Sequence, residues 1–271
     1  MTIFSNKELA LRLETIEALN QVEFAITHNR FHADSIAEYK KVGSGYAVYA
    51  GPDSPLTQAF GLALDGVMEE QDLSEMEEFY KQRGSAVNIE VCHLSDMSLT
   101  ELLMDRGYRV IEYSNVLLRR LNAEDVFNLS SDNLIREIRE DEIDVFAGTV
   151  SEGFLEGSEI PEYFTDIFRV FFRQSNGVCF GAFRNQEPAG GGAVFIRDGV
   201  AEFGGASTLP KYRNLGIQTD LLRQRLNYAV SKGCDLAMVT TLPGSVSHRN
   251  VEKQGFQVVY ARTKFTRTWQ E

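Results

Sequence analysis

The segment from residue 200 to residue 232 constrains the fold of this chain more than any other. A run rich in small residues ends at Pro210, and the residues after Gly216 repeat hydrophobic side chains at helical spacing. The turn between them reads Arg213-x-x-Gly216-x-Gln218. The segment therefore predicts a strand, a glycine-bearing loop and a helix, and such a helix begins with amide N–H groups that have no partner within it.

These properties suit the binding of an anion. Free N–H groups and the positive end of the helix dipole attract phosphate oxygens. Gly216 lets the backbone approach the anion closely, and Arg213 adds a positive charge. The turn is neither a P-loop, which needs Gly-Lys-Ser/Thr, nor the three-glycine dinucleotide fingerprint. The alternative interpretation is an ordinary strand-to-helix turn with a surface arginine.

The turn resembles the pyrophosphate loop of the GNAT N-acetyltransferase superfamily, whose signature is Gln/Arg-x-x-Gly-x-Gly/Ala after the fourth strand. Gln218 departs from the last small residue of that signature. The resemblance implies that acetyl-CoA is the cofactor and that its pantetheine arm pairs with strand backbone like an added strand. The residues that would contact the cofactor are Ala206, Ser207, Thr208, Arg213, Asn214, Leu215, Gly216, Ile217, Gln218 and Thr219, with Asn250 further along the chain.

The order of elements predicted for residues 132–271 resembles the whole GNAT fold. Strands are expected at 134–138, 178–183, 189–196 and 236–241, helices at 141–154, 161–174 and 246–254, and a closing strand or hairpin at 256–269. The strand and helix of residues 200–232 lie between the third and fourth of these strands. This gives the order β-α-α-β-β-β-α-β-α-β. The run of Gly190, Gly191 and Gly192 and the pair Gly204 and Gly205 fit either a cavity where a ligand nears the main chain or bulges that curve the sheet.

The first half of the chain is expected to repeat the second. Helices are predicted at 6–39, 66–83 and 99–106, with strands at 45–50, 56–64, 86–94 and 108–121. Arg106-Gly107-Tyr108 parallels Gln254-Gly255-Phe256, which suggests a duplication. We therefore predict an α/β (α+β) protein with a degenerate GNAT-like domain at 1–128 and an acetyltransferase domain at 129–271. Each domain would be a mixed, mostly antiparallel twisted sheet flanked by helices, although an unrelated α/β domain is the alternative for the first half.

The charge distribution separates the two halves. Residues 65–78, where the first half would place its own loop, carry seven carboxylates and no cation, so a pyrophosphate would be repelled there. The first domain is therefore expected to be non-catalytic. The net charge of −12 disfavours nucleic-acid binding, which needs a basic face. It favours a cationic acceptor, either a small molecule or a peptide amine.

Acyl transfer to an amine requires a base, because the amine is mostly charged at neutral pH. Glu202 lies eleven residues before Arg213 and matches the glutamate base of the histone-acetylating branch of the family. A strand glutamate that faces solvent is the alternative. Many family members carry a tyrosine acid four residues before the Gly-Phe pair, where this chain has Val251. The polar residues that could replace it are Asn250, Ser247, His248 and Tyr260, of which Tyr260 is predicted to be catalytic with Glu202.

Several further features bear on compartment and cofactors. The three cysteines form no Cys-x-x-Cys pair, and no apolar run approaches the length of a membrane helix, so a cytoplasmic protein is expected. His28 and His32 have metal-ligand spacing, but a solvated helix face is the preferred interpretation and no metal is predicted.

The sequence therefore predicts an N-acetyltransferase that moves an acetyl group from acetyl-CoA to a primary amine by direct attack in a ternary complex. A non-catalytic acyl-CoA-binding or regulatory protein is the alternative. Transfer to a hydroxyl group, or of a longer acyl chain, is a third interpretation.

Overall fold

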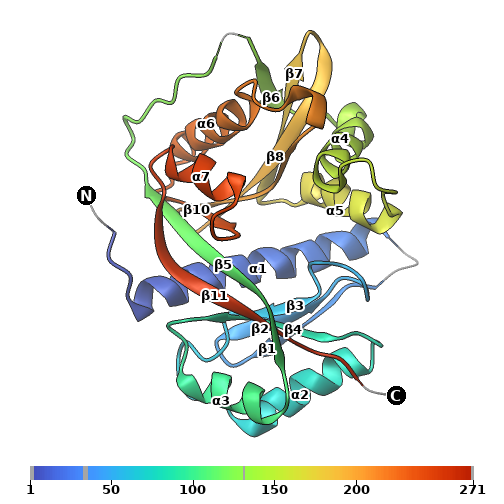
Figure 1. Cartoon of the computed structure of the whole chain (residues 1–271), viewed down its shortest axis with the longest axis vertical. Coiled ribbons are helices and arrows are strands. Elements are labelled where there is room, and N and C mark those ends of the chain that lie inside the picture. Colours follow the sequence, from blue (N-terminus) through green and yellow to red (C-terminus); the bar gives the residue numbers. More distant parts are fainter. Residues whose placement is uncertain (1–2, 33–35, 131, 270–271) are drawn as a thin grey trace. The chain divides into compact units, whose positions relative to one another are not determined.

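The computed structural model describes residues 3–32, 36–130 and 132–269, and contacts divide the chain into two compact units (Figure 1). Unit 1 comprises residues 1–117, 241–243 and 258–271, as far as these are described, and unit 2 comprises 118–240 and 244–257. These bounds differ from the predicted domains of 1–128 and 129–271, because the last strand of the chain is grouped with unit 1. The boundary at residue 128 stays a prediction about folding units.

Unit 2 contains a sheet in which consecutive strands are mostly neighbours. Its neighbouring strands pair antiparallel, except that the strand at residues 200–208 and the strand at residues 236–241 are parallel. In spatial order the strands are β6 (Leu134–Glu137), β7 (Gly177–Arg184), β8 (Glu187–Arg197), β9 (Val200–Thr208) and β10 (Leu236–Thr241).

Helices cover both faces of the unit 2 sheet (Figure 1). One face is covered by α4 (Ile143–Leu155) and α5 (Glu162–Arg173), and the other by α6 (Ile217–Ser231). A short helix, α7 (Val246–Glu252), follows β10. The apolar face of α5 brings Phe171 against Phe195 of β8, with ring centroids 5.0 Å apart. This packing of helices on a sheet positions the loop that precedes α6.

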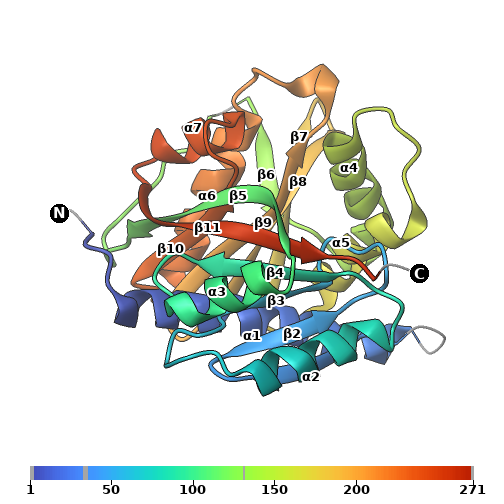
Figure 2. The ribbon, with the colours of Figure 1, turned by 60° about the horizontal axis from the view of Figure 1, so that its bottom comes forward.

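Unit 1 contains six strands that lie side by side, with helices on the two faces of this part of the sheet. Figure 2 shows α2 and α3 in front of this sheet. Its strands, in spatial order, are β1 (Glu38–Val42), β2 (Gly45–Tyr49), β3 (Gln58–Phe60), β4 (Val87–Cys92), β11 (Gln257–Arg267) and β5 (Arg109–Arg120). Its helices are α1 (Lys7–Phe31), α2 (Glu70–Lys81) and α3 (Met97–Asp105). Among the described helices, none, α1 included, combines the length and apolar composition needed to cross a bilayer.

The pairing of β11 explains why unit 1 takes the end of the chain. β11 runs antiparallel to β4, with Arg262 opposite Cys92 and Phe265 opposite Ile89. Phe265 joins the buried hydrophobic cluster of unit 1 together with Leu73 of α2. Strand pairing and burial therefore bind the last strand to the first half of the chain.

The predicted fold class is confirmed, because the structure is a mixed α/β arrangement with mostly antiparallel strands flanked by helices. The predicted helix over 6–39 is too long, since α1 ends at Phe31 and a strand begins at Glu38. Residues 33–35 lie outside the described residues.

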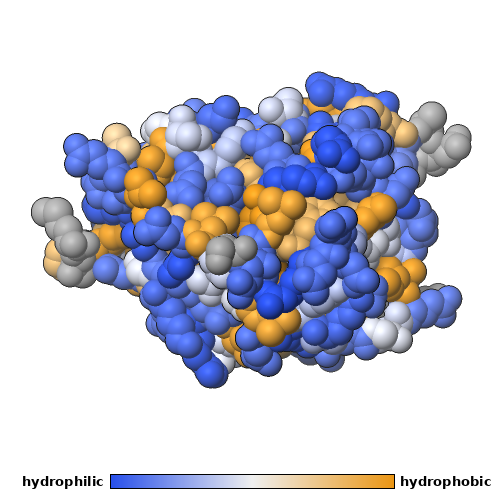
Figure 3. All heavy atoms as spheres, turned by 90° about the horizontal axis from the view of Figure 1, so that it is seen from above, coloured by the Kyte–Doolittle hydropathy of each residue, from blue (hydrophilic) through white to orange (hydrophobic). Residues whose placement is uncertain are grey.

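Figure 3 shows one face of the molecule on which hydrophilic residues predominate, with smaller groups of hydrophobic residues among them. This is the surface expected of a chain in which 24% of residues are charged.

Candidate functional site

Strands β9 and β10 run side by side over only part of their length. Their parallel register begins at Val200 opposite Leu236 and ends at Phe203 opposite Val239. Among the described strands, the rest of β9 pairs only with β8. One edge of β9 is therefore open from Gly204 to Thr208, and an open edge can pair with an extended ligand as if it were another strand.

A bulge interrupts β9 within this open stretch. Ser207 lies opposite Gly191, but Gly204 lies opposite Ala193, so β9 has one more residue than β8 between these pairs. Gly205 takes a φ of +54°, a left-handed conformation that glycine adopts without strain. The predicted alternative of a sheet-curving bulge is therefore confirmed for Gly205. A bulge leaves backbone groups unpaired in the ladder, and these groups can face a ligand.

The loop that follows β9 leads into α6 with a row of free amides. After the turn Pro210–Tyr212 the chain reaches Gly216, which has a φ of +78° and stands directly before the first residue of α6. No hydrogen bond from the backbone amides of residues 214–219 to another described residue is present, and no side chain caps the helix. A helix start with free amides attracts phosphate oxygens. The geometry therefore fits the predicted diphosphate group.

Buried side chains that the sequence did not single out hold this loop. Asp220, in the first turn of α6, is 2% exposed. Its Oδ1 accepts from the Ser130 amide at 3.0 Å, and its Oδ2 accepts from Nδ2 of Asn133 at 2.7 Å. The same Asn133 nitrogen donates to the Leu215 carbonyl at 3.1 Å, and Arg184 Nη1 donates to Asn133 Oδ1 at 3.0 Å. In a sequence, an acidic residue in the first turn of a helix is usually explained by its favourable interaction with the helix dipole. The sequence therefore contained no sign that Asp220 takes part in this buried network.

Arg213 contacts the end of α4. Its Nη2 lies 2.9 Å from Oε1 of Glu156 and donates to the Gly153 carbonyl at 3.2 Å, and its Nε donates to the Thr208 carbonyl at 3.4 Å. These bonds tie the loop to the last turn of α4 and neutralise part of the guanidinium charge. The contact between Arg213 and a phosphate stays a prediction. The structure adds a second role, in which Arg213 holds the loop against the end of α4.

The side chains at the end of β9 are engaged within the protein. Ser207 Oγ donates to the Val150 carbonyl at 2.7 Å, and Gln218 Nε2 donates to Thr208 Oγ1 at 2.8 Å. Ile217 is buried, whereas Leu215 is exposed. A cofactor along this stretch would therefore contact backbone groups, as predicted for Ala206, Ser207 and Thr208.

Glu202 lies on β9 shortly before the bulge and is half-buried. It stands opposite Phe195, whose ring packs on Phe171 of α5, so the carboxylate belongs to the sheet face covered by α5. Gly205 is three positions further along this extended strand, or about 10 Å away. The role of Glu202 as a base for a group at the bulge, directly or through water, stays a prediction.

The candidate acids fall in different places. Tyr260 belongs to unit 1, where it is buried, and burial raises its pKa well above the ordinary value. In unit 2, Asn250 is half-buried on α7, Ser247 is exposed, and His248 is buried with Nε2 3.3 Å from Oε1 of Glu252. The structure therefore does not bring Tyr260 into the unit that contains the loop, and the role of each residue stays a prediction.

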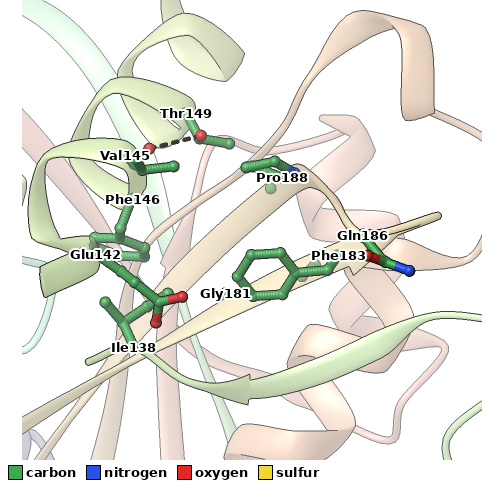
Figure 4. Close-up of a pocket in the computed structure, with 11 residues that line it drawn as sticks. Ile138, Glu142, Val145, Phe146, Thr149, Gly181, Phe183, Gln186 and Pro188 are labelled. Atoms are coloured by element: carbon green, nitrogen blue, oxygen red, sulfur yellow. Dashed lines mark hydrogen bonds between the residues drawn. The ribbon is translucent and has the colours of Figure 1, made fainter.

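A hollow of about 180 Å³ lies between α4 and the β7–β8 hairpin (Figure 4). Phe146, Phe183 and Pro188 line it, and the carboxylate of Glu142 lies beside them. Both oxygens of Glu142 are bonded to Arg136, at 2.7 and 2.6 Å, and these bonds lower the pKa of Glu142 to about 2. A carboxylate with so low a pKa is a weak base, so Glu142 is a poor candidate for the general base.

Comparison with known proteins bears on the family and the fold. Residues 136–256 match the model of the Acetyltransferase (GNAT) family. None of the curated protein sequences is similar enough to this chain to count as a match.

Solved structures extend the likeness to the rest of the chain. A GCN5-related N-acetyltransferase from Kribbella flavida is 13% identical, with a TM-score of 0.67 and 96% of both chains covered. A tandem GNAT protein from the clavulanic acid biosynthesis pathway is 14% identical, with a TM-score of 0.62, 98% of this chain and 96% of that chain covered. A GCN5-related N-acetyltransferase from Sphaerobacter thermophilus is 14% identical, with a TM-score of 0.59, 85% of this chain and 75% of that chain covered. At such identities the likeness shows the fold, and together with the family match it identifies residues 136–256 as a GNAT-family domain.

Proposed function

We propose that this protein is an N-acetyltransferase that moves an acetyl group from acetyl-CoA to a primary amine by direct attack in a ternary complex. The observation that carries the proposal is the row of free amides at residues 214–219, next to the open edge of β9. The amides would bind the diphosphate, and the backbone of Ala206, Ser207 and Thr208 would pair with the pantetheine arm.

Acetyl-CoA would supply the acetyl group as a thioester. Glu202 would take a proton from the ammonium form of the acceptor, directly or through water, which leaves a nucleophilic amine. The new C–N bond would form as the C–S bond breaks, while backbone amides at the bulge donate to the acyl oxygen. The proton that the nitrogen loses would pass to the departing thiolate or to solvent. A thiolate with a pKa near ~8.5 leaves without a strong acid, so the absence of a tyrosine at Val251 does not prevent the reaction.

The acceptor is proposed to be a cationic primary amine, either a small molecule or a peptide. The support is the net charge of −12, which favours the approach of a cation. A diamine and a lysine-containing peptide are therefore expected to react faster than a neutral amine, and this preference should weaken at high salt.

The test is to incubate the protein with acetyl-CoA and this panel of amines while thiol release is followed spectroscopically and cofactor binding by calorimetry. Glu202→Gln should lower turnover roughly 100-fold near neutral pH while cofactor affinity stays within about twofold. The loss should shrink as the pH rises and solvent deprotonates the amine. Glu124→Gln, which removes an exposed carboxylate of the same unit, serves as the control. Full activity of Glu202→Gln at every pH would remove Glu202 from the mechanism.

A non-catalytic acyl-CoA-binding protein is the second candidate. It is favoured by the buried Val251 at the position of the family tyrosine and by the burial of Tyr260. Calorimetric binding of acetyl-CoA without thiol release for any amine would support this candidate and contradict the enzyme.

A further inference from the structure

We propose that Arg225 is a positioning residue for acyl transfer: it holds the β9 bulge in place and sets a positive charge beneath the backbone amides that face the acyl oxygen. The catalytic part of this inference rests on the proposed function. The structural part, that Arg225 holds the bulge, stands on the contacts of the side chain alone.

Arg225 reaches from α6 to the strand that faces the bulge. The residue is 3% exposed. Its Nη1 donates to the Ala193 carbonyl at 3.1 Å, and its Nε donates to the Leu221 carbonyl of its own helix at 3.2 Å. Ala193 is the residue at which the β8–β9 register shifts. The guanidinium therefore anchors β8 at the position where β9 carries its extra residue.

Gly192 shows how closely the guanidinium approaches the bulge. A Cβ on Gly192 would lie 3.1 Å from Cζ and Nη1 of Arg225 and 3.0 Å from Cβ of Ala206. The guanidinium and Ala206 therefore flank the same small space, and a side chain at position 192 would displace one of them. The missing side chain at this position lets Arg225 lie directly under the bulge.

The charge of Arg225 has no counter-ion among the described residues. Its surroundings are the Phe203 ring, 5.0 Å from the guanidinium carbon, the buried thiol of Cys179 and the backbone of β8. Burial lowers the pKa of Arg225 to about 10, so the side chain is still charged at neutral pH. The buried arginine of unit 1 differs, because Arg262 bonds to Glu14 and Glu17 at 2.6 Å each.

A buried cation without a counter-ion costs free energy unless nearby dipoles or charges compensate for it. The carbonyls of Ala193 and Leu221 compensate in part. Negative charge that develops on an acyl oxygen at the bulge would complete the compensation, and in a water-poor interior this attraction is stronger than in solution. Arg225 would thus act through the bulge amides and need not touch the substrate.

The experiment compares Arg225→Met, which removes the charge at similar volume, with Arg225→Lys, which keeps the charge. The matched control is Arg223→Met, the same change about half a turn away on α6. The side chain of Arg223 donates to Gln254 Oε1 and to the Asn128 carbonyl. We expect Arg225→Met to lower kcat about tenfold or more with KM for acetyl-CoA within about threefold, Arg225→Lys to recover most of kcat, and Arg223→Met to leave kcat unchanged.

Amide hydrogen exchange provides a readout that does not depend on an acceptor. In Arg225→Met the amides of Gly205 and Ala206 should exchange faster, while those of α5 keep their rates. If the wild type turns over no amine, the proposed function fails, yet this exchange measurement still decides whether Arg225 holds the bulge. Unchanged kcat and unchanged exchange in Arg225→Met would overturn the inference. If Arg225→Met does not fold, Arg225→Gln replaces it, and failure of both to fold would overturn the inference in favour of a purely structural role.

Discussion

The two units each contain a strand, a loop and a helix at corresponding places, but the loops differ in what their backbone groups bind. In unit 2, β9 leads through the loop at residues 209–216 into α6, and the amides of residues 214–219 are free. In unit 1, β3 leads through residues 61–69 into α2, and residues 61–64 and 68 of this loop are buried whereas Val67 is exposed.

The unit 1 loop is closed by its own side chains and by the chain that follows β4. Leu62 and Leu64 are each 1% exposed. Ser95 Oγ donates to the Leu62 carbonyl at 2.8 Å, and the Asp96 amide donates to the Ala63 carbonyl at 2.7 Å. The corresponding opening in unit 2, between β9 and β10, has no such bonds among the described residues.

Two amides of the unit 1 loop also have acceptors. The Leu64 amide donates to Ser44 Oγ at 3.2 Å, and the Met68 amide donates to Ser98 Oγ at 2.8 Å. The first turn of α2 carries Glu70 and Asp72, which repel an anion. The comparison teaches that the order of elements alone does not make a phosphate site. The amides of residues 70–72 at the start of α2 also have no acceptor among the described residues, but carboxylates surround them.

The largest effect on this comparison is expected from Gly216→Val. A β-branched residue at a φ of +78° is strained by roughly 2 kcal/mol, and relief of that strain would turn the loop amides away. We expect coenzyme A affinity, measured by calorimetry, to fall about thirtyfold.

Two matched glycine variants control for strain and for the choice of unit. Gly233→Val, at a φ of +74° beyond the other end of α6, should lose similar stability with unchanged affinity. Gly66→Val in the unit 1 loop should also leave affinity unchanged. Weaker coenzyme A binding by Gly66→Val would mean that the closed loop takes part in binding and would break the comparison.

Asp220→Ala is expected to have the next largest effect. It leaves the buried Asn133 amide and the Ser130 N–H without their acceptor, which costs about 1–3 kcal/mol of stability. The Leu215 carbonyl would then lose its fixed position, and we expect affinity to fall roughly tenfold. The control is Glu70→Ala in the first turn of α2, which should leave both the melting temperature and the coenzyme A affinity nearly unchanged. An unchanged melting temperature and affinity in Asp220→Ala would show that the network does not support the loop.

Arg213→Ala should weaken coenzyme A binding by about 1 kcal/mol, the scale of a charge-assisted hydrogen bond. If the guanidinium contacts phosphate, the loss measured by calorimetry should shrink as salt rises. Lys211→Ala, which removes an exposed cation of the same loop paired with Glu187, is the control. A loss that does not depend on salt would indicate that Arg213 acts only through its bond to Gly153 at the end of α4.

The smallest effect concerns the pH dependence of stability, in which the two units should differ in sign. The folded pKa of Glu142 in unit 2 is about 2, below its ordinary 4.5, so its ion pair with Arg136 stabilises the fold above pH 4.5 and is lost as the pH falls toward 2. Burial raises the pKa of Glu14 in unit 1, so its contribution is present at low pH and is lost as the pH rises above 4.5. Glu142→Gln should therefore flatten the decline in stability between pH 4.5 and 2 by at most about 1 kcal/mol in urea unfolding. Glu14→Gln should leave that decline in place, and identical curves for wild type and Glu142→Gln would contradict the assignment to Glu142.

Much of the fold could be predicted because its signals are local. The spacing of Leu221, Leu222 and Leu226 predicted α6, and each of these leucines is buried. The duplication inferred from Gly107 and Gly255 is consistent with the structure, since each glycine lies between a helix, α3 or α7, and a following strand, β5 or β11. Strand β1 was missed, because residues 38–42 follow a long helical pattern and carry little alternation of their own.

The candidate site was only partly predictable. Arg213 and Gly216 stand in the loop as expected, but Tyr260 lies in the other unit and Glu202 is positioned without a demonstrated role. Nothing near Asp220 in the sequence indicates that its carboxylate meets Asn133, whose position along the chain is remote. Likewise, Arg225 reads as one of several cations on a helix, and only the packed sheet shows that it is buried without a counter-ion.

The sequence by itself indicated where most of the helices and strands and the glycine-bearing loop lie, and it predicted that the first half does not hold a diphosphate, because carboxylates fill residues 65–78. These properties follow from side-chain spacing, turn chemistry and charge within a few residues. The tertiary structure decided which strand pairs with which, so that β11 joins β4, where the β9 bulge falls, and which amides stay free. Those outcomes depend on contacts between residues far apart in the chain, whose burial and hydrogen bonding exist only once the units are packed.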